Sequence, residues 1–232
     1  MPSSPHIVSD VMTQTVVSVG RDAAFKEIVE LMAQWKVSAL PVLEGEGRVI
    51  GVVSEADLLP KEEYRDDLPD LSRTGGGAAS ATGSAAAAAK AARLAELAKA
   101  SATTANALMS TPAVTVHADT TLAQAARIMA RRGVKRLPVV DRIGILQGMV
   151  SRGDLLKVFL RPDAELAAEV HRTLAPLFPR QDVTTTVHDG VVTLRGTMHD
   201  RRLVPVAARL AQSVEGVVDV RLDLSVPDDQ HR

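Results

Sequence analysis

The chain has 232 residues, of which 46% are hydrophobic and 24% are charged, a balance typical of a globular protein. It contains no cysteine and only 2% aromatic residues, which excludes disulfides, thiolate metal sites and cysteine nucleophiles and argues against binding of nucleic acid by base stacking. No stretch approaches the roughly 18 consecutive apolar residues of a membrane span, and no basic segment followed by an apolar run opens the chain, so we expect a cytoplasmic protein.

The formal net charge of −1 is unevenly distributed. Residues 1–89 carry a net charge of −6, residues 90–163 carry +7, and residues 164–232 carry −2. A basic segment can attract phosphate groups, and segments of opposite charge can also attract each other across an oligomer interface. The charge pattern leaves both interpretations open.

One order of signals occurs twice: a short apolar run, an amphipathic helix, two strands and a second helix. GVVSEADLL at 51–59 returns as GMVSRGDLL at 148–156, an offset of 97 positions that holds along both copies without a gap. Asp22 and Asp119 precede the amphipathic helices, where we expect them to act as N-caps. The first helix has apolar residues at the spacing of one helical face, namely Phe25, Ile28, Val29 and Met32.

The segment between the two copies is rich in Gly, Ser and Ala and has too few large apolar residues for a packed core. We interpret residues 63–103 as a flexible linker that is partly helical. Strong helix formers from Ser84 onward predict a helix that reaches about Ala100. We favour a tether with some helix over a helix that binds a partner.

A different pattern begins at residue 164. It predicts a helix, a hairpin with Asp189-Gly190 at its turn, a second helix, and a last strand in which apolar and polar residues alternate. Residues 164–226 therefore predict a small sheet with one face covered by helices, and 227–232 are left as a tail.

Several motifs stand in order along the chain: DVMT at 10–13, ALPV and RLPV in corresponding strands of the two copies, and the two Ser-x-x-Asp segments. They resemble the cystathionine β-synthase (CBS) domain, and two such domains in tandem resemble a Bateman module covering 7–62 and 104–163. Residues 164–226, with the DGVVTLRG hairpin, resemble a BON domain. The combination resembles bacterial CBS-CBS-BON proteins. The implied fold class is mixed (α+β and α/β), with two βαββα repeats and one αββαβ domain.

The CBS resemblance implies two related clefts that hold adenosine-containing ligands: AMP, ADP, ATP or S-adenosylmethionine. In that family the Asp of the motif binds the ribose hydroxyls, and the nearby Ser or Thr reaches ribose or phosphate. The positions that match in this chain are Ser54 with Asp57, and Ser151 with Asp154. Backbone near the Pro of the preceding strand lines the adenine pocket in the family, which here implies Ala39, Leu40, Arg136 and Leu137.

A carboxylate suits a ribose because it only accepts hydrogen bonds, whereas two neighbouring hydroxyls can both donate to it. Ser-x-x-acid is also the pattern of a capping box, in which the two residues satisfy backbone groups at a helix start. Ligand contact and capping therefore both remain open for the two motifs.

The two copies differ ahead of the LPV segment. The second copy has Lys135 and Arg136 where the first has Ser38 and Ala39. Guanidinium groups pair with phosphate oxygens and a Lys adds a point charge. We expect the cleft reached by Lys135 and Arg136 to bind the phosphorylated ligand, and the other cleft to be weak, empty or suited to an uncharged adenosine moiety. A solvated basic helix end is the alternative.

The six His residues never occur at metal-ligand spacing, and the sequence has no P-loop and no nucleophile with a base and an orienting acid. We therefore expect no enzyme activity, no metal and no catalytic residue. The favoured function is an adenine-nucleotide-sensing regulatory protein, with the nucleotide or S-adenosylmethionine as a regulatory ligand rather than a required cofactor.

We expect a homodimer formed through the CBS repeats and an unidentified protein partner that reads the signal through the dimer or the BON domain. The alternative function is a non-enzymatic interaction or membrane-surface protein that uses the BON domain, with the CBS pair as a dimerisation scaffold. The BON segment has a net charge of −2, which argues against attraction to anionic lipid. Binding of nucleic acid by the basic segment is disfavoured because the sequence shows no motif that reads bases.

Overall fold

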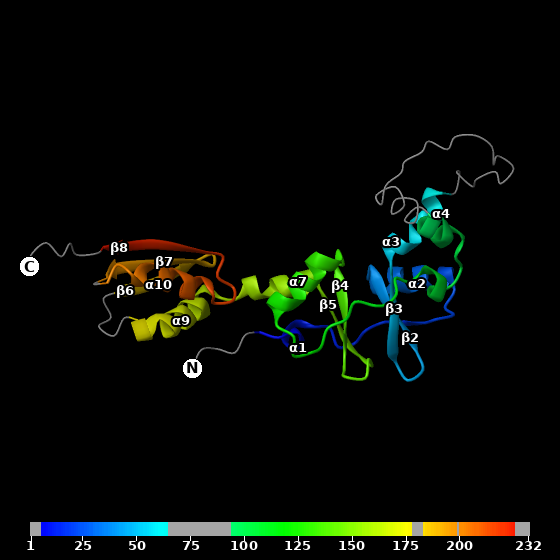
Figure 1. Ribbon diagram of the computed structural model, residues 1–232, viewed down its shortest axis with the longest axis horizontal. Coiled ribbons are helices and arrows are strands. Elements are labelled where there is room, and N and C mark those ends of the chain that lie inside the picture. Colours follow the sequence, from blue (N-terminus) through cyan, green and yellow to red (C-terminus); the bar gives the residue numbers. More distant parts are fainter. Residues whose placement is uncertain (1–5, 65–93, 178–182, 199, 226–232) are drawn as a thin grey trace, which may run out of the picture. The chain divides into compact units, whose positions relative to one another are not determined.

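A computed structural model of the chain describes residues 6–64, 94–177, 183–198 and 200–225. These residues belong to two compact units. The central unit comprises 12–118 and 129–150, and the terminal unit comprises 1–11, 119–128 and 151–232. Figure 1 shows the ribbon of both units and labels many of their helices and strands.

The first repeat lies in the central unit and is built on a three-stranded sheet of order β1-β2-β3. Strand β2 pairs in parallel with β1 and antiparallel with β3. Helix α2 connects β1 to β2, and helices α3 and α4 follow β3. The elements are β1 (Val19–Gly20), α2 (Phe25–Trp35), β2 (Ala39–Glu44), β3 (Arg48–Ser54), α3 (Glu55–Leu58) and α4 (Pro60–Glu63). The βαββα order predicted for this repeat is confirmed.

The apolar face of α2 packs on the sheet. Ile28 and Met32 are buried there with Val42 and Val53, whereas Val29 is 41% exposed, so the predicted stripe is narrower than expected. The helical residues 94–101 precede α6 (Ala105–Leu108), which also contributes to this core. The predicted helix thus exists as far as it falls within the described residues, and its expected start at Ser84 lies outside them.

The N-cap prediction was wrong for both amphipathic helices. Helix α2 begins at Phe25 with Ala24 at the N-cap, two residues after Asp22, and the Glu27 carboxylate accepts the Ala24 N–H at 3.3 Å. In the second repeat the Thr121 hydroxyl accepts the Gln124 N–H at 3.3 Å, in place of Asp119. In each case the chain makes a further turn before the helix starts.

The second repeat has the same order of elements, but its first strand is reduced to one parallel bridge between Val116 and Val139. Strands β4 and β5 form a two-stranded sheet. Gly148 of β5 lies close to the backbone of Thr13. Thr13 and Met149 exchange two backbone hydrogen bonds, each with an N···O distance of 2.9 Å. The elements are α7 (Leu122–Arg132), β4 (Arg136–Val140), β5 (Leu146–Ser151), α8 (Arg152–Leu156) and the 3-10 helix η1 (Lys157–Leu160).

The terminal unit contains a helix-covered sheet of order β6-β7-β8. Strands β6 and β7 form the predicted antiparallel hairpin, with positive φ at Asp189 and Gly190, and β8 pairs in parallel with β7. The αββαβ order is confirmed. The elements here are α1 (Val8–Val11), α9 (Asp163–Leu174), the 3-10 helix η2 (Ala175–Leu177), β6 (Val183–His188), β7 (Val191–Thr197), α10 (Leu203–Gln212) and β8 (Asp219–Ser225).

Apolar and polar residues alternate along these strands, so that one face of the sheet is buried and the other faces solvent. Val192 and Leu194 are fully buried in one core with residues of α9 and α10. The opposite face is polar, and Arg195 pairs there with Asp223 at 3.1 Å. Within the described ranges, every helix is too short or too polar to span a lipid bilayer.

Candidate functional site

A cavity of about 390 Å³ opens within the central unit, lined by residues of both repeats. Its volume falls in the range of small-molecule sites. The polar and charged side chains at its wall include Ser38, Ser54, Glu55 and Asp57 from the first repeat, and Arg132, Lys135 and Arg136 from the second. The structure thus brings together the first Ser-x-x-Asp motif and the basic pair that were predicted separately.

The Ser54–Asp57 motif stands where β3 ends and α3 begins. The backbone N–H and the hydroxyl of Ser54 donate to Asp57 Oδ2 at 2.8 and 2.6 Å. One carboxylate oxygen therefore closes the start of the helix, as the capping interpretation requires.

The other carboxylate oxygen of Asp57 faces donors from distant parts of the chain. Asp57 Oδ1 accepts from the Lys99 ammonium group and from the Ser110 hydroxyl, the latter at 3.2 Å. The Asp57 side chain is 8% exposed and that of Lys99 is 24% exposed. Lys99 was not predicted as a site residue, because nothing in an Ala-rich helical segment distinguishes one Lys from its neighbours.

Arg136 opens β4 and lies against a neutral partner. Its Nε and Nη2 atoms donate to the Ser38 hydroxyl at 3.2 and 3.0 Å. Within the described part of the chain, no carboxylate forms an ion pair with Arg136, Lys135 or Arg132. Because Asp57 is already paired with Lys99, Glu55 is the only unpaired carboxylate among the wall residues described, and the cavity is predominantly cationic.

The residues predicted around the adenine pocket divide into two groups. Ala39 and Arg136 line the cavity. Leu40 and Leu137 are fully buried, and their side chains belong to the strand interiors rather than to the cavity wall. The apolar part of the wall comes instead mainly from four residues that were not predicted as site residues, namely Val52, Pro112, Ala113 and Val114.

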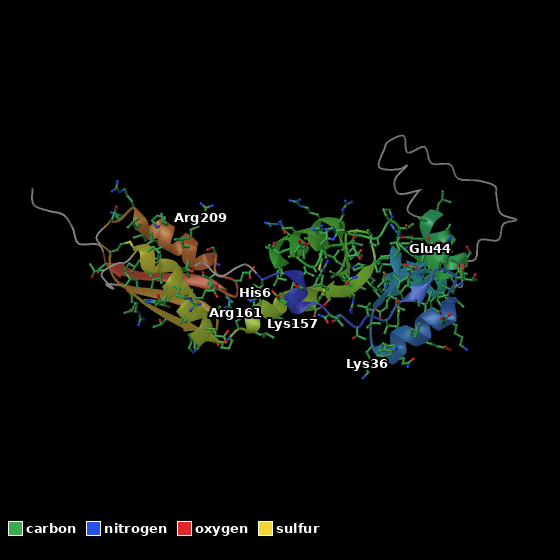
Figure 2. All side chains as sticks on the ribbon, turned by 90° about the horizontal axis from the view of Figure 1, so that it is seen from below. His6, Lys36, Glu44, Lys157, Arg161 and Arg209 are labelled. Atoms are coloured by element: carbon green, nitrogen blue, oxygen red, sulfur yellow. The ribbon has the colours of Figure 1, made fainter. Side chains whose placement is uncertain are left out.

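The second motif lies in the terminal unit at the start of α8. The N–H and hydroxyl of Ser151 donate to Asp154 Oδ2 at 2.9 and 2.6 Å, and the Asp154 N–H donates back to the Ser151 hydroxyl at 3.3 Å. This arrangement is a complete capping box. Lys157, labelled in Figure 2, places its Nζ 2.8 Å from Asp154 Oδ1.

These contacts set the pKa of Asp154. Partial burial acts to raise it, but hydrogen bonds from Lys157 and Ser151 together outweigh burial and hold the pKa below its ordinary value. Asp154 therefore stays ionised at neutral pH. Among the described residues, no group of three or more acidic or His side chains is placed to hold a metal ion.

Comparison with known families agrees with this geometry. The CBS domain model matches residues 8–62 and 105–161, and the BON domain model matches residues 162–228. The chain is a tandem CBS-domain protein with a C-terminal BON domain. The cavity lies among residues of the CBS pair.

Relatives of the CBS pair support the fold. An uncharacterized protein of Methanocaldococcus jannaschii is 27% identical over 154 residues, which is 66% of this chain and 91% of that protein. The chloroplastic CBS domain-containing protein CBSX2 of Arabidopsis thaliana is 28% identical over 165 residues, 67% of this chain and 64% of CBSX2. A crystal structure of CBSX2 in complex with AMP matches 67% of this chain and 97% of that one, with a TM-score of 0.54 and 27% identity.

Proposed function

We propose that the CBS pair binds an adenosine phosphate in the cavity of the central unit and that the protein acts as a regulatory nucleotide sensor. The observation that carries this proposal is that Asp57 and Arg136 both lie on the wall of one cavity, where the hydrogen-bond partner of Arg136 is the neutral Ser38 hydroxyl and not a carboxylate. A carboxylate for ribose and a guanidinium for phosphate are the two polar groups that an adenosine phosphate needs. The AMP held by CBSX2 is consistent with such a ligand.

Each part of the ligand has a partner at the wall. Arg136 and Lys135 would contact the phosphate, because Arg136 has only the neutral Ser38 hydroxyl to exchange for it. Ser54 and Asp57 would contact the ribose. The adenine would lie against the apolar wall and the backbone of Ala39, since the faces of its aromatic ring gain free energy by leaving water and its polar edge can form hydrogen bonds with backbone groups.

The charge of the cavity favours a phosphorylated ligand over S-adenosylmethionine. The sulfonium of S-adenosylmethionine is positive and would face Arg132, Lys135 and Arg136. Like charges within one small cavity repel each other, and a partly enclosed cavity screens this repulsion less than bulk water does. AMP, ADP and ATP are therefore the ligands we expect.

Ser151 and Asp154 remain a second proposed ligand site of lower affinity. Their mutual hydrogen bonds already complete the capping box, and a ligand would have to replace Lys157 at Asp154 Oδ1. This site would be weak or would take an uncharged adenosine moiety.

The test is calorimetric titration of the full chain with AMP, ADP, ATP and S-adenosylmethionine. We expect replacement of Arg136 by Met to weaken AMP binding about ten- to a hundredfold, the effect of losing charge-assisted hydrogen bonds. The matched control is Arg142→Met, which removes an exposed Arg from a turn away from the cavity wall and should leave the affinity unchanged. No binding of any of the four ligands, or equal losses in both variants, would contradict the proposal.

We further propose that the protein works without chemistry of its own, as a homodimer that signals to a protein partner. Ligand binding shifts a conformational balance only if the two states differ in affinity for the ligand. Sedimentation equilibrium of the full chain with and without AMP tests the assembly, and a monomer at micromolar concentration in both samples would contradict it.

A further inference from the structure

The Asp57 carboxylate accepts four hydrogen bonds within the central unit. Oδ2 accepts two from Ser54, and Oδ1 accepts one each from Lys99 and Ser110. An ionised carboxylate offers about four acceptor positions. A ribose that binds Asp57 must therefore take the place of at least one of these donors.

The donors differ in how easily they can leave. Ser54 is three residues from Asp57 and forms part of the helix start. Ser110 is fixed by two backbone hydrogen bonds with Val52, at 2.8 and 3.2 Å. Lys99 reaches Asp57 with the end of a long side chain, is 24% exposed and can regain water. Lys99 is the donor that a ribose would displace.

Lys99 also anchors the helical residues 94–101 to the cavity wall. This segment also forms hydrogen bonds with the end of the first repeat, from Lys61 Nζ to the Ala100 carbonyl at 3.1 Å and from the Tyr64 hydroxyl to Glu96 at 2.9 Å. The chain after this segment is held more firmly, since Ala102 is buried in the core and the Thr103 carbonyl accepts the Phe25 N–H at 2.9 Å. Loss of the Lys99 contact would therefore increase the mobility of residues 94–101 and leave the core of the first repeat intact.

We propose that the ion pair between Lys99 and Asp57, here called the clasp, breaks when an adenosine ligand binds. The proposal rests on the proposed function, because it assumes that the ribose binds Asp57. Ribose hydroxyls and the Lys99 ammonium group compete for Asp57 Oδ1, so binding frees Lys99 and loosens residues 94–101, which lie in the connection between the two CBS repeats. The closed clasp lowers the apparent affinity for the ligand, and the released segment reports that the cavity is occupied.

The first measurement is the affinity of the full chain for AMP in Lys99→Met. If the clasp is closed about 70 to 90% of the time, its removal should tighten AMP binding about three- to tenfold, because apparent affinity scales with the fraction of competent protein. The matched control is Lys26→Met. The Lys26 side chain is 89% exposed, and its Nζ lies 3.9 Å from Glu30 Oε1. The control substitution therefore removes the same charge away from the cavity and should leave the affinity for AMP unchanged.

The second measurement is amide hydrogen exchange of residues 94–101 in the full wild-type chain, so it stands even if Lys99→Met fails to fold. AMP should accelerate exchange in this segment, whereas inorganic phosphate at equal ionic strength should not, because phosphate carries no ribose. In Lys99→Met exchange should already be fast and insensitive to AMP.

The outcomes separate the clasp from the proposed function. Weaker AMP binding by Lys99→Met would show that Lys99 holds the ligand and would overturn the clasp alone. Wild-type binding of AMP with unchanged or slower exchange in 94–101 would also overturn the clasp and leave the proposed function standing. Absence of binding of AMP, ADP, ATP and S-adenosylmethionine by both wild type and Lys99→Met would overturn the proposed function and the clasp with it.

Discussion

The two Ser-x-x-Asp motifs have the same spacing and the same place in their repeats, yet their surroundings differ. In both, the Ser hydroxyl lies 2.6 Å from Oδ2 of the Asp. Asp57 Oδ1 is held by Lys99, 42 positions away, whereas Asp154 Oδ1 is held by Lys157, three positions away on the same stretch of helix. The local motif determines one oxygen of each carboxylate. The other oxygen is held by a contact that the tertiary structure sets at Asp57 and by a local contact at Asp154. The motif alone therefore does not decide between capping and ligand binding.

The largest expected difference between the motifs is in stability. Asp57→Asn removes the charge from a buried acceptor that serves Ser110 and the partly exposed Lys99 ammonium group, which should lower the free energy of unfolding by about 2 to 3 kcal/mol. Asp154→Asn keeps the Ser151 contacts and loses a pair whose Lys157 side chain is 56% exposed, so its cost should stay below about 1 kcal/mol. Urea unfolding at neutral pH, followed by circular dichroism, measures both.

The double variant Asp57→Asn with Lys99→Met separates the lost ion pair from the unpaired charge. It should be more stable than Asp57→Asn alone, because the Lys99 charge no longer lacks a partner. Equal stability losses in Asp57→Asn and Asp154→Asn would show that the two carboxylates have equivalent surroundings.

The glycines of the paired strands extend the comparison to the backbone. A Cβ on Gly148 would lie 2.9 Å from the Thr13 carbonyl oxygen, which is fixed by backbone pairing, and 2.8 Å from Met12 Sδ. The three atoms nearest to a Cβ on Gly51 all belong to the Met109 side chain: Sδ is closest, followed by Cγ at 2.8 Å and Cβ at 3.0 Å. Side chains move more easily than paired backbone.

Gly148→Ala should therefore destabilise the protein by about 2 kcal/mol and Gly51→Ala by about 1 kcal/mol. Thermal unfolding of the two variants measures the difference. The reverse order would mean that the strand preceding the second motif adapts more readily than the strand preceding the first.

Sequence periodicity predicted the elements of both repeats because local patterns determine them. The offset between the copies paired Gly51 with Gly148, and the spacing of Ser54 and Asp57 predicted their mutual contact. Lys99 escaped prediction because its partner is set by the folding of a distant segment. The family resemblance implies that the backbone of Leu40 and Leu137 lines the adenine pocket, and this stays a prediction. Their side chains face the interior, because successive side chains on a strand face opposite sides.

The smallest expected effect concerns the titration of Asp154. Its pKa is held low partly by Lys157, so Lys157→Met should raise that pKa toward the ordinary value, as followed by carboxyl ¹³C shifts in NMR. A carboxylate with a lowered folded-state pKa contributes stability above its unfolded-state pKa and loses it as the pH falls through the folded-state pKa. The stability difference between wild type and Lys157→Met should thus be constant near neutral pH and vanish in acid. It should also shrink with added salt, because Lys157 is more than half exposed. A pKa unchanged by the substitution would assign the whole shift to the contacts with Ser151.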